Sequence, residues 1–284
     1  MDRETENINT EVGAMPYIDP NKINRVVIKV GSSTLTHGTG KLNLRRINKL
    51  AEVLADLRNS GHQVILVTSG AVAAGAAKLN LGGRPHDTAA KQAAAAVGQC
   101  ALMHLYDKNL SEYGATVAQV LLTRDILDNA TSRQNAANTF SWLLEHGVIP
   151  VVNENDSVST YELEKLVGFG DNDRLGANVA VLCKADLLII LSDIDGFYDS
   201  DPRENEDAKL IPVVSKITDE LRTLAGGAGA LGTGGMAAKL AAAEIAMAAG
   251  VNIVLASGED PNIVLDICSG RARGTLFRAE EINK

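Results

Sequence analysis

The run Arg25–Leu35 constrains the fold of this chain more than any other stretch. Its apolar part, Val26–Val30, is β-branched apart from one lysine, as in a central strand that is buried on both faces of a parallel sheet. A buried Lys29 needs an anion or a route to water, because an unpaired buried charge is costly. The Gly31–Ser33 turn lies where open α/β sheets bind ligands. We therefore expect a phosphate or carboxylate site there; the alternative is an edge strand whose lysine points to solvent.

Predicted helices and strands alternate along the rest of the chain. Helices are predicted at 44–57, 91–113, 131–146, 175–183, 219–225 and 236–249, and strands at 25–30, 63–68, 116–122, 148–152, 186–192 and 252–256, the last closing the sheet. Pro150 has no N–H to donate, which indicates that it lies where its strand begins or where the hydrogen-bonding pattern of the sheet is interrupted. This alternation predicts an α/β fold, a three-layer αβα sandwich with an open, mainly parallel central sheet.

The composition argues against several classes of function. Of the 284 residues 45% are hydrophobic, and the formal net charge is −8. This acidic balance argues against a nucleic-acid partner, which a basic patch would bind, and favours a small molecule. No stretch approaches the roughly 20 apolar residues of a membrane span, and residues 1–20 show no signal-peptide pattern. We expect a cytoplasmic protein with a disordered polar extension at 1–20. Cys100, Cys183 and Cys268 show no metal or redox spacing, and we expect buried apolar roles for them.

A second candidate anion site is the glycine-rich segment 232–239. Three glycines and Thr233 stand at the start of a predicted helix, where free N–H groups and the helix dipole attract anions. Lys239 falls in the first turn of this helix and can reach back to a phosphate bound there. The alternative is a flexible connector before an alanine-rich helix.

Acidic motifs lie between the two lysine segments. Asn153–Asp156 directly follows a buried strand, and its side chains suit an ammonium group. Gly170–Asp173 stands at a helix start, where one aspartate can act as an N-cap, and Ser192–Asp193 ends a further strand. Carboxylates that lie among phosphate-binding lysines usually orient those lysines or hold a magnesium ion. The residues alone do not decide between these two roles. The five histidines show no metal spacing and no Ser/His/Asp order.

Five motifs in this order resemble those of the amino acid kinase family: Lys29-Val-Gly-Ser-Ser33, Thr68-Ser-Gly-Ala71, Asn153-Glu-Asn-Asp156, Gly170-Asp-Asn-Asp173 and Gly232-Thr-Gly-Gly-Met-Ala-Ala-Lys239. The resemblance covers residues 22–277. The first and last motifs resemble those of several sister kinases, whereas the two acidic motifs resemble those of members that phosphorylate glutamate. Many bacterial members continue into a C-terminal PUA domain, and we expect none here.

The resemblance implies transfer of the γ-phosphoryl group of ATP to the side-chain carboxylate of L-glutamate, the first step of proline biosynthesis. It implies that Lys29 and Lys239 supply positive charge, that Asp173 orients them, and that Mg²⁺ accompanies ATP, with no protein residue named as its ligand. The implied nucleotide-binding residues are Lys29, Gly31, Ser192, Asp193, Thr233, Gly234, Gly235, Met236, Ala237, Ala238 and Lys239. The implied substrate-binding residues are Ser69, Gly70, Asn153, Asp156, Asp171 and Asn172. Residues 21–184 would form the acid-substrate half of one kinase domain and residues 185–284 its nucleotide half.

The resemblance also implies a homodimer or tetramer, feedback inhibition by proline and transient contact with glutamyl-phosphate reductase, which would consume the labile acyl phosphate. Two alternatives stay open. A sister kinase for another small acid would keep both lysines and the glycine loop, although an N-acetylated acid has no ammonium group for Asp156 to bind. A nucleotide-binding or sensing protein without turnover would have lost a lysine or Asp173, and this chain has all three.

Overall fold

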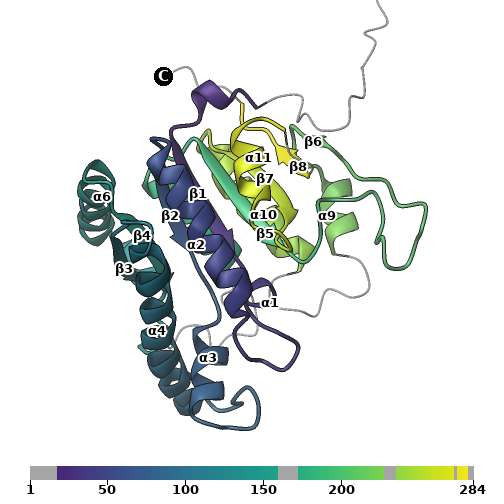
Figure 1. Cartoon of the computed structure of the whole chain (residues 1–284). Coiled ribbons are helices and arrows are strands. Elements are labelled where there is room, and N and C mark those ends of the chain that lie inside the picture. The colour runs from purple at the N-terminus through teal and green to yellow at the C-terminus, as the bar shows by residue number, and fades with distance from the viewer. Residues whose placement is uncertain (1–17, 159–171, 227–234, 272–273, 281–284) are drawn as a thin grey trace, which may run out of the picture.

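An eight-stranded sheet runs through the centre of the molecule (Figure 1). The computed structural model describes residues 18–158, 172–226, 235–271 and 274–280. The strand order is β3-β4-β2-β1-β5-β7-β8-β6. The strands are β1 (Arg25–Val30), β2 (Gln63–Val67), β3 (Val117–Leu122), β4 (Ile149–Glu154), β5 (Leu187–Ser192), β6 (Val213–Val214), β7 (Asn252–Ser257) and β8 (Thr275–Phe277). β1 pairs in parallel with β2 and β5, so Lys29 belongs to a central strand and the edge-strand alternative is wrong.

Two features of the sheet refine the expected pattern. The strand at 252–256 was expected to close the sheet, and this is wrong, because β8 and β6 follow β7. β8 runs antiparallel to β7, and β6 runs parallel to β8. β8 has three residues and β6 has two, so both are too short to show a periodic pattern in the sequence. Pro150 pairs with Ala118 of β3, and the pairing of β4 with β2 starts at Val151, so the proline stands where that pairing begins.

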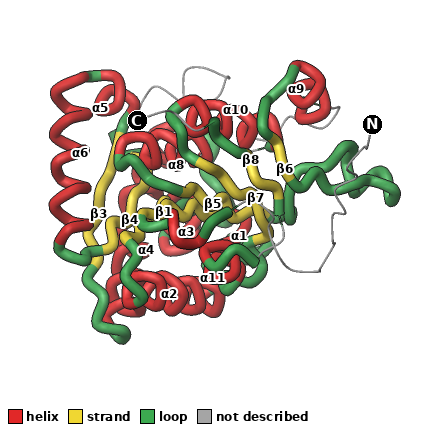
Figure 2. The backbone as a smooth tube through the Cα atoms, turned by 90° about the horizontal axis from the view of Figure 1, so that it is seen from above, coloured by secondary structure: helices red, strands yellow, loops and turns green. Residues whose placement is uncertain are grey.

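Helices cover both faces of the sheet (Figure 2). The helices α2 (Leu44–Asn59), α4 (Thr88–Ser111) and α11 (Ile263–Cys268) lie on one face, and α6 (Ala130–Glu145), α8 (Asn172–Leu182) and α10 (Met236–Ala248) on the other. The shorter helices are η1 (Pro20–Lys22), α1 (Ser32–Leu35), α3 (Ala71–Lys78), α5 (Arg124–Asp128) and α9 (Asp219–Ala225). The fold is the predicted three-layer αβα sandwich. None of the helices that the structure describes is long and apolar enough to cross a bilayer.

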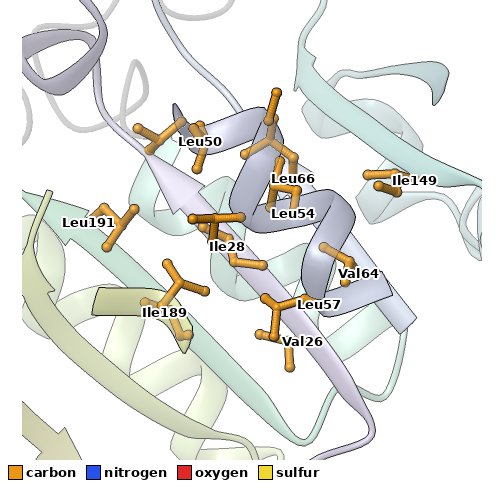
Figure 3. Packing of buried hydrophobic residues seen from close by; sticks show 14 of the residues in the cluster. Val26, Ile28, Leu50, Leu54, Leu57, Val64, Leu66, Ile149, Ile189 and Leu191 are labelled. Atoms are coloured by element: carbon orange, nitrogen blue, oxygen red, sulfur yellow. The ribbon is translucent and has the colours of Figure 1, made fainter. Parts of the chain in front are cut away.

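Side chains of β1 alternate between two hydrophobic clusters because a strand points successive residues to opposite faces. Val26 and Ile28 pack against α2, where Leu50, Leu54 and Leu57 meet them (Figure 3). Complete burial of one such side chain stabilises the fold by about 1.5–3 kcal/mol. Val27 belongs to the cluster beneath α6, α8 and α10, so Lys29, two residues later, starts on the α8 face.

The helices α3 and α4 pack backbone against backbone. A Cβ atom on Gly98 would lie 1.7 Å from the carbonyl oxygen of Ala71, and one on Gly75 would lie 1.7 Å from that of Ala94. Only glycine permits this approach. The contact holds α4 against α3, which begins directly after the carboxyl end of β2.

The three cysteines do not share one environment. Cys183 and Cys268 are buried as expected, and burial raises the pKa of each thiol to about 12. Cys100 is exposed on α4, so the expectation of burial is wrong for this residue. The sequence of α4 does not reveal which side of the helix faces solvent, because small and apolar residues occur all around the helix.

Candidate active site

Two buried lysines share one buried aspartate at the carboxyl edge of the sheet. Lys29 Nζ lies 2.5 Å from Asp173 Oδ1, and Lys239 Nζ lies 3.3 Å from Asp173 Oδ2. Each lysine is 7% exposed and Asp173 is fully buried. The three residues come from β1, the first turn of α8 and the first turn of α10. Gly176 lets α8 lie close to β1, because a Cβ there would come within 3.3 Å of Lys29 Cβ.

Electrostatics keeps the carboxylate of Asp173 ionised. Burial pushes the pKa of Asp173 upward, but the ammonium groups of Lys29 and Lys239 outweigh burial and hold that pKa below its ordinary value. Two ammonium groups and one carboxylate carry one net positive charge together. A buried cluster of this charge, at the end of parallel strands, is suited to attract an anion.

A network of amides and hydroxyls forms the second part of the site. Asn172 Nδ2 donates to the carbonyl oxygen of Thr68 at 2.6 Å, to Ser69 Oγ at 2.5 Å and to Asn153 Oδ1 at 3.2 Å. Asn153 Nδ2 in turn donates to Gln99 Oε1 of α4 at 2.9 Å. The structure therefore brings Ser69, Asn153 and Asn172 together, three residues that the motifs singled out.

Sequence reasoning missed Gln99. It is 7% exposed, and its Nε2 atom is buried without a hydrogen-bond partner among the residues that the structure describes. A glutamine in an alanine-rich helix does not by itself indicate a binding role. The sequence clue that was available is its position beside Gly98, where α4 contacts α3.

The other predicted residues lie at the ends of these same elements. Gly31 precedes α1, and a Cβ on it would lie 3.4 Å from Lys29 Nζ. Gly70 precedes α3 with a φ of 93°, in the left-handed region that favours glycine. The buried Ser192 ends β5 and donates through Oγ to Asp193 Oδ1 at 3.0 Å.

Two further groups complete the predicted set. Asp156 is half-buried in the turn after β4. Gly235 is the N-cap of α10, whose first turn contains Met236, Ala237 and Ala238. Three predicted residues, Asp171, Thr233 and Gly234, lie outside the described residues.

A metal ion would find no ready protein cage in the described part of the chain. Within residues 18–158, 172–226, 235–271 and 274–280, no three His, Cys, Asp or Glu residues are grouped so that they could hold one. Asp173 already contacts both lysines. Mg²⁺ usually keeps several waters and is held by one or two carboxylates together with substrate phosphates, and this chemistry needs no such cage.

An open parallel sheet with two buried lysines, a shared aspartate and a helix N-terminus at its carboxyl edge defines the class of enzymes that transfer phosphoryl groups. Within that class, the chain belongs to the amino acid kinase family, whose model matches residues 24–257.

Relatives within this family are similar to the chain over nearly its whole length. Glutamate 5-kinase of Clostridium perfringens is 54% identical over 258 residues, which cover 90% of this chain and 96% of the relative. Glutamate 5-kinase of Listeria innocua is 53% identical, with 90% and 94% covered.

Solved structures share the fold at low sequence identity. Isopentenyl phosphate kinase of T. acidophilum has a TM-score of 0.60 at 18% identity and covers 90% of this chain and 100% of its own. UMP kinase of Bacillus anthracis has a TM-score of 0.58 at 17% identity, with 90% and 96% covered. These two structures support the three-layer architecture.

Proposed function

We propose that the chain catalyses the ATP-dependent phosphorylation of the side-chain carboxylate of L-glutamate, which yields L-glutamyl 5-phosphate. The observation that carries this proposal is the buried Lys29–Asp173–Lys239 cluster beside the Asn172 network. It occurs in a chain more than half identical to proteins named glutamate 5-kinase.

Charge repulsion is the main chemical obstacle in this reaction. A carboxylate with a pKa near 4.3 is ionised at neutral pH, so the acceptor needs no general base. The enzyme must instead bring one anion in line with a polyanion. Lys29 and Lys239 stabilise the negative charge on the transferring group, and Asp173 holds both ammonium groups in position.

The acceptor binds at the amide network. Ser69, Asn153 and Asn172 supply polar groups for L-glutamate, together with Gly70 and Asp171, and the carboxylate of Asp156 pairs with its α-ammonium group. Gln99 joins this set because its buried Nε2 atom is an available donor for a substrate carboxylate. This acid-substrate half comprises residues 21–184.

The nucleotide binds in the half formed by residues 185–284. Its phosphates face the N-terminus of α10, where residues 233–239 provide backbone N–H groups and Lys239, and Gly31 and Lys29 approach from β1. Ser192 and Asp193 end β5 at the same edge. Mg²⁺ enters as the complex with ATP, where it supplies positive charge to the phosphate oxygens.

Further partners follow from the same assignment. They are proline as a feedback inhibitor, a second or further copies of the chain in a dimer or tetramer, and glutamyl-phosphate reductase in transient contact with the enzyme. The names of the relatives support the pathway from which these partners are drawn. We further propose that the protein is cytoplasmic and that neither nucleic acids nor membranes are among its partners.

The test is ADP release from Mg-ATP by purified protein, with hydroxylamine present to trap acyl phosphate. The acceptors compared are L-glutamate, L-aspartate, N-acetyl-L-glutamate, UMP and none. We expect glutamate-dependent ADP release with a matching amount of hydroxamate. Activity with another acceptor would instead indicate a sister kinase for that acceptor. No ADP release with any acceptor would favour the nucleotide-binding alternative.

Lys29→Met tests the assignment of the cluster. It should lower turnover by at least about a hundredfold, because loss of one charged donor at a transferring group costs about this much. Lys108→Met is the matched control, since Lys108 is exposed on α4. Equal turnover in the Lys29→Met variant and the wild type would contradict the assignment.

A further inference from the structure

A cavity of about 310 Å³ lies apart from the candidate active site, among α5, α6, α8 and α10. Figure 2 shows these four helices on the same face of the sheet. Three arginines line the cavity: Arg124 at the start of α5, Arg133 on α6 and Arg174 on α8. None of the residues assigned to the candidate active site lines it.

The charges of this cavity are unbalanced. Arg124 forms an ion pair with Asp128, with 3.2 Å between Nε and Oδ2, and Asp128 also lines the cavity. Arg174 is half-buried and Arg133 is exposed, and neither guanidinium group makes a hydrogen bond or ion pair with the described part of the chain. Three guanidinium groups against one carboxylate leave a formal charge of about +2 in the cavity.

The rest of the lining is mainly apolar. Its other members are Leu127, Asn178, Val181, Leu182 and Ile245. A small volume with apolar walls and a few convergent polar groups is typical of a small-molecule site. Guanidinium groups match the geometry of phosphate and carboxylate oxygens through paired N–H donors.

We infer that this cavity binds a small dianion, namely a phosphate group. The net charge of the lining matches a phosphate dianion, and the apolar wall accommodates a short organic substituent on it. Arg174 is the central ligand, because it is half-buried and lies on α8, the helix that also contributes Asn178, Val181 and Leu182 to the lining. This inference does not depend on the proposed function.

The cavity shares one helix with the candidate active site. Arg174 follows Asp173 in the first turn of α8, and the two side chains leave the helix in directions about 100° apart. Asp173 contacts the lysines while Arg174 lines the cavity. A phosphate bound to Arg174 is therefore held by the same helical turn that positions Lys29 and Lys239.

The test is equilibrium dialysis of the full chain with radiolabelled inorganic phosphate. Because the two lysines also attract phosphate, the Lys239→Met variant serves as the starting protein; it keeps the Lys29–Asp173 ion pair. In this background we expect one phosphate site. Arg174→Gln should weaken it by about tenfold or more, since a charge-assisted hydrogen bond is lost, and Arg133→Gln should weaken it too.

Arg45→Gln is the matched control, because Arg45 is exposed on α2 on the opposite face of the sheet and its replacement removes the same charge. Equal weakening by this variant, or undiminished binding in both Arg133→Gln and Arg174→Gln, would overturn the inference. Binding of succinate but not phosphate would also overturn it. A dimer that Arg174→Gln dissociates, without phosphate binding by either form, would assign the cavity to a second copy instead.

Discussion

Replacing Asp173 with asparagine tests whether one buried carboxylate holds the site together. The substitution keeps the size of the side chain and removes its charge. Lys29 and Lys239, each 7% exposed, would then share a neutral amide in place of a carboxylate. We expect Asp173→Asn to lower both the stability of the fold and the proposed turnover.

The size of the stability loss follows from burial and distance. At an effective dielectric constant of about 20, a charge pair 3.3 Å apart attracts with about 5 kcal/mol. Removal of one partner from a buried ion pair typically costs about 3–5 kcal/mol, which is the range we expect here. With an m-value of about 3 kcal/mol/M, the midpoint of urea unfolding should fall by about 1–1.7 M.

The loss should depend on pH in a defined direction. The pKa of Asp173 is lowered in the folded state, so its contribution to stability is present above the unfolded pKa near 3.9 and is lost as pH falls through the lower folded pKa. The difference between wild type and Asp173→Asn should therefore shrink in acid below about pH 4.

The assay is urea unfolding followed by circular dichroism and by Trp142 fluorescence between pH 3 and pH 10. Asp219→Asn is the control: its carboxylate also pairs with an arginine, Arg222 at 2.5 Å, but its side chain is 97% exposed. We expect no measurable shift from this control. A midpoint for Asp173→Asn within error of the wild type at pH 7, or a difference that grows in acid, would refute the argument from the buried ion pairs.

Three further substitutions test other parts of the molecule. Asp156→Asn should raise the KM for L-glutamate about tenfold or more with a small change in kcat, and an unchanged KM in steady-state kinetics would contradict its role toward the ammonium group. Thr68→Val should lower the free energy of unfolding by about 1–3 kcal/mol, because Thr68 Oγ1 lies 2.7 Å from the hydroxyl of the buried Tyr106 and that hydroxyl would lose its partner. The double variant with Tyr106→Phe should recover much of this loss, and no recovery would exclude an unsatisfied hydroxyl as the cause. Gly98→Ala should cost at least about 3 kcal/mol because its Cβ would lie 1.7 Å from a backbone carbonyl of α3, whereas Gly83→Ala, with nothing within 4 Å, should stay within about 0.5 kcal/mol in the same unfolding assay.

The centre of the sheet and its lysine were predictable from the sequence. A β-branched run must be buried on both faces, so Lys29 inside it required an explanation that an exposed lysine does not. The alternation of helices and strands then predicted the layers, and all six predicted helices agree with the structure to within three residues at each end. The Lys29–Asp173–Lys239 contacts agree with the expectation that an aspartate orients the lysines, whereas the roles of these residues in phosphoryl transfer stay a prediction.

Other parts of the site depend on tertiary packing that no local pattern reports. Gln99 reaches Asn153 because α4 packs closely on α3 at Gly98, which is a contact between helices. The cavity with Arg174 combines side chains from the neighbouring helices α5 and α6 with others from α8 and α10, which lie far along the sequence. Very short strands such as β8 carry no period that a sequence window can detect.

The pairing of β1 with β5 has a consequence for how the protein folds during its synthesis. β1 leaves the ribosome first among the strands, but its partner β5 follows about 160 residues later, and Lys239 about 210 residues after Lys29. At about 5–20 residues per second, the nascent chain carries an apolar strand with an open edge for at least several seconds, and Lys239 emerges about 10–40 s after Lys29. An open apolar strand edge invites pairing with other chains. The buried lysine cluster is therefore completed only when most of the polypeptide has been made, and an interrupted chain would have an aggregation-prone sheet and no complete site.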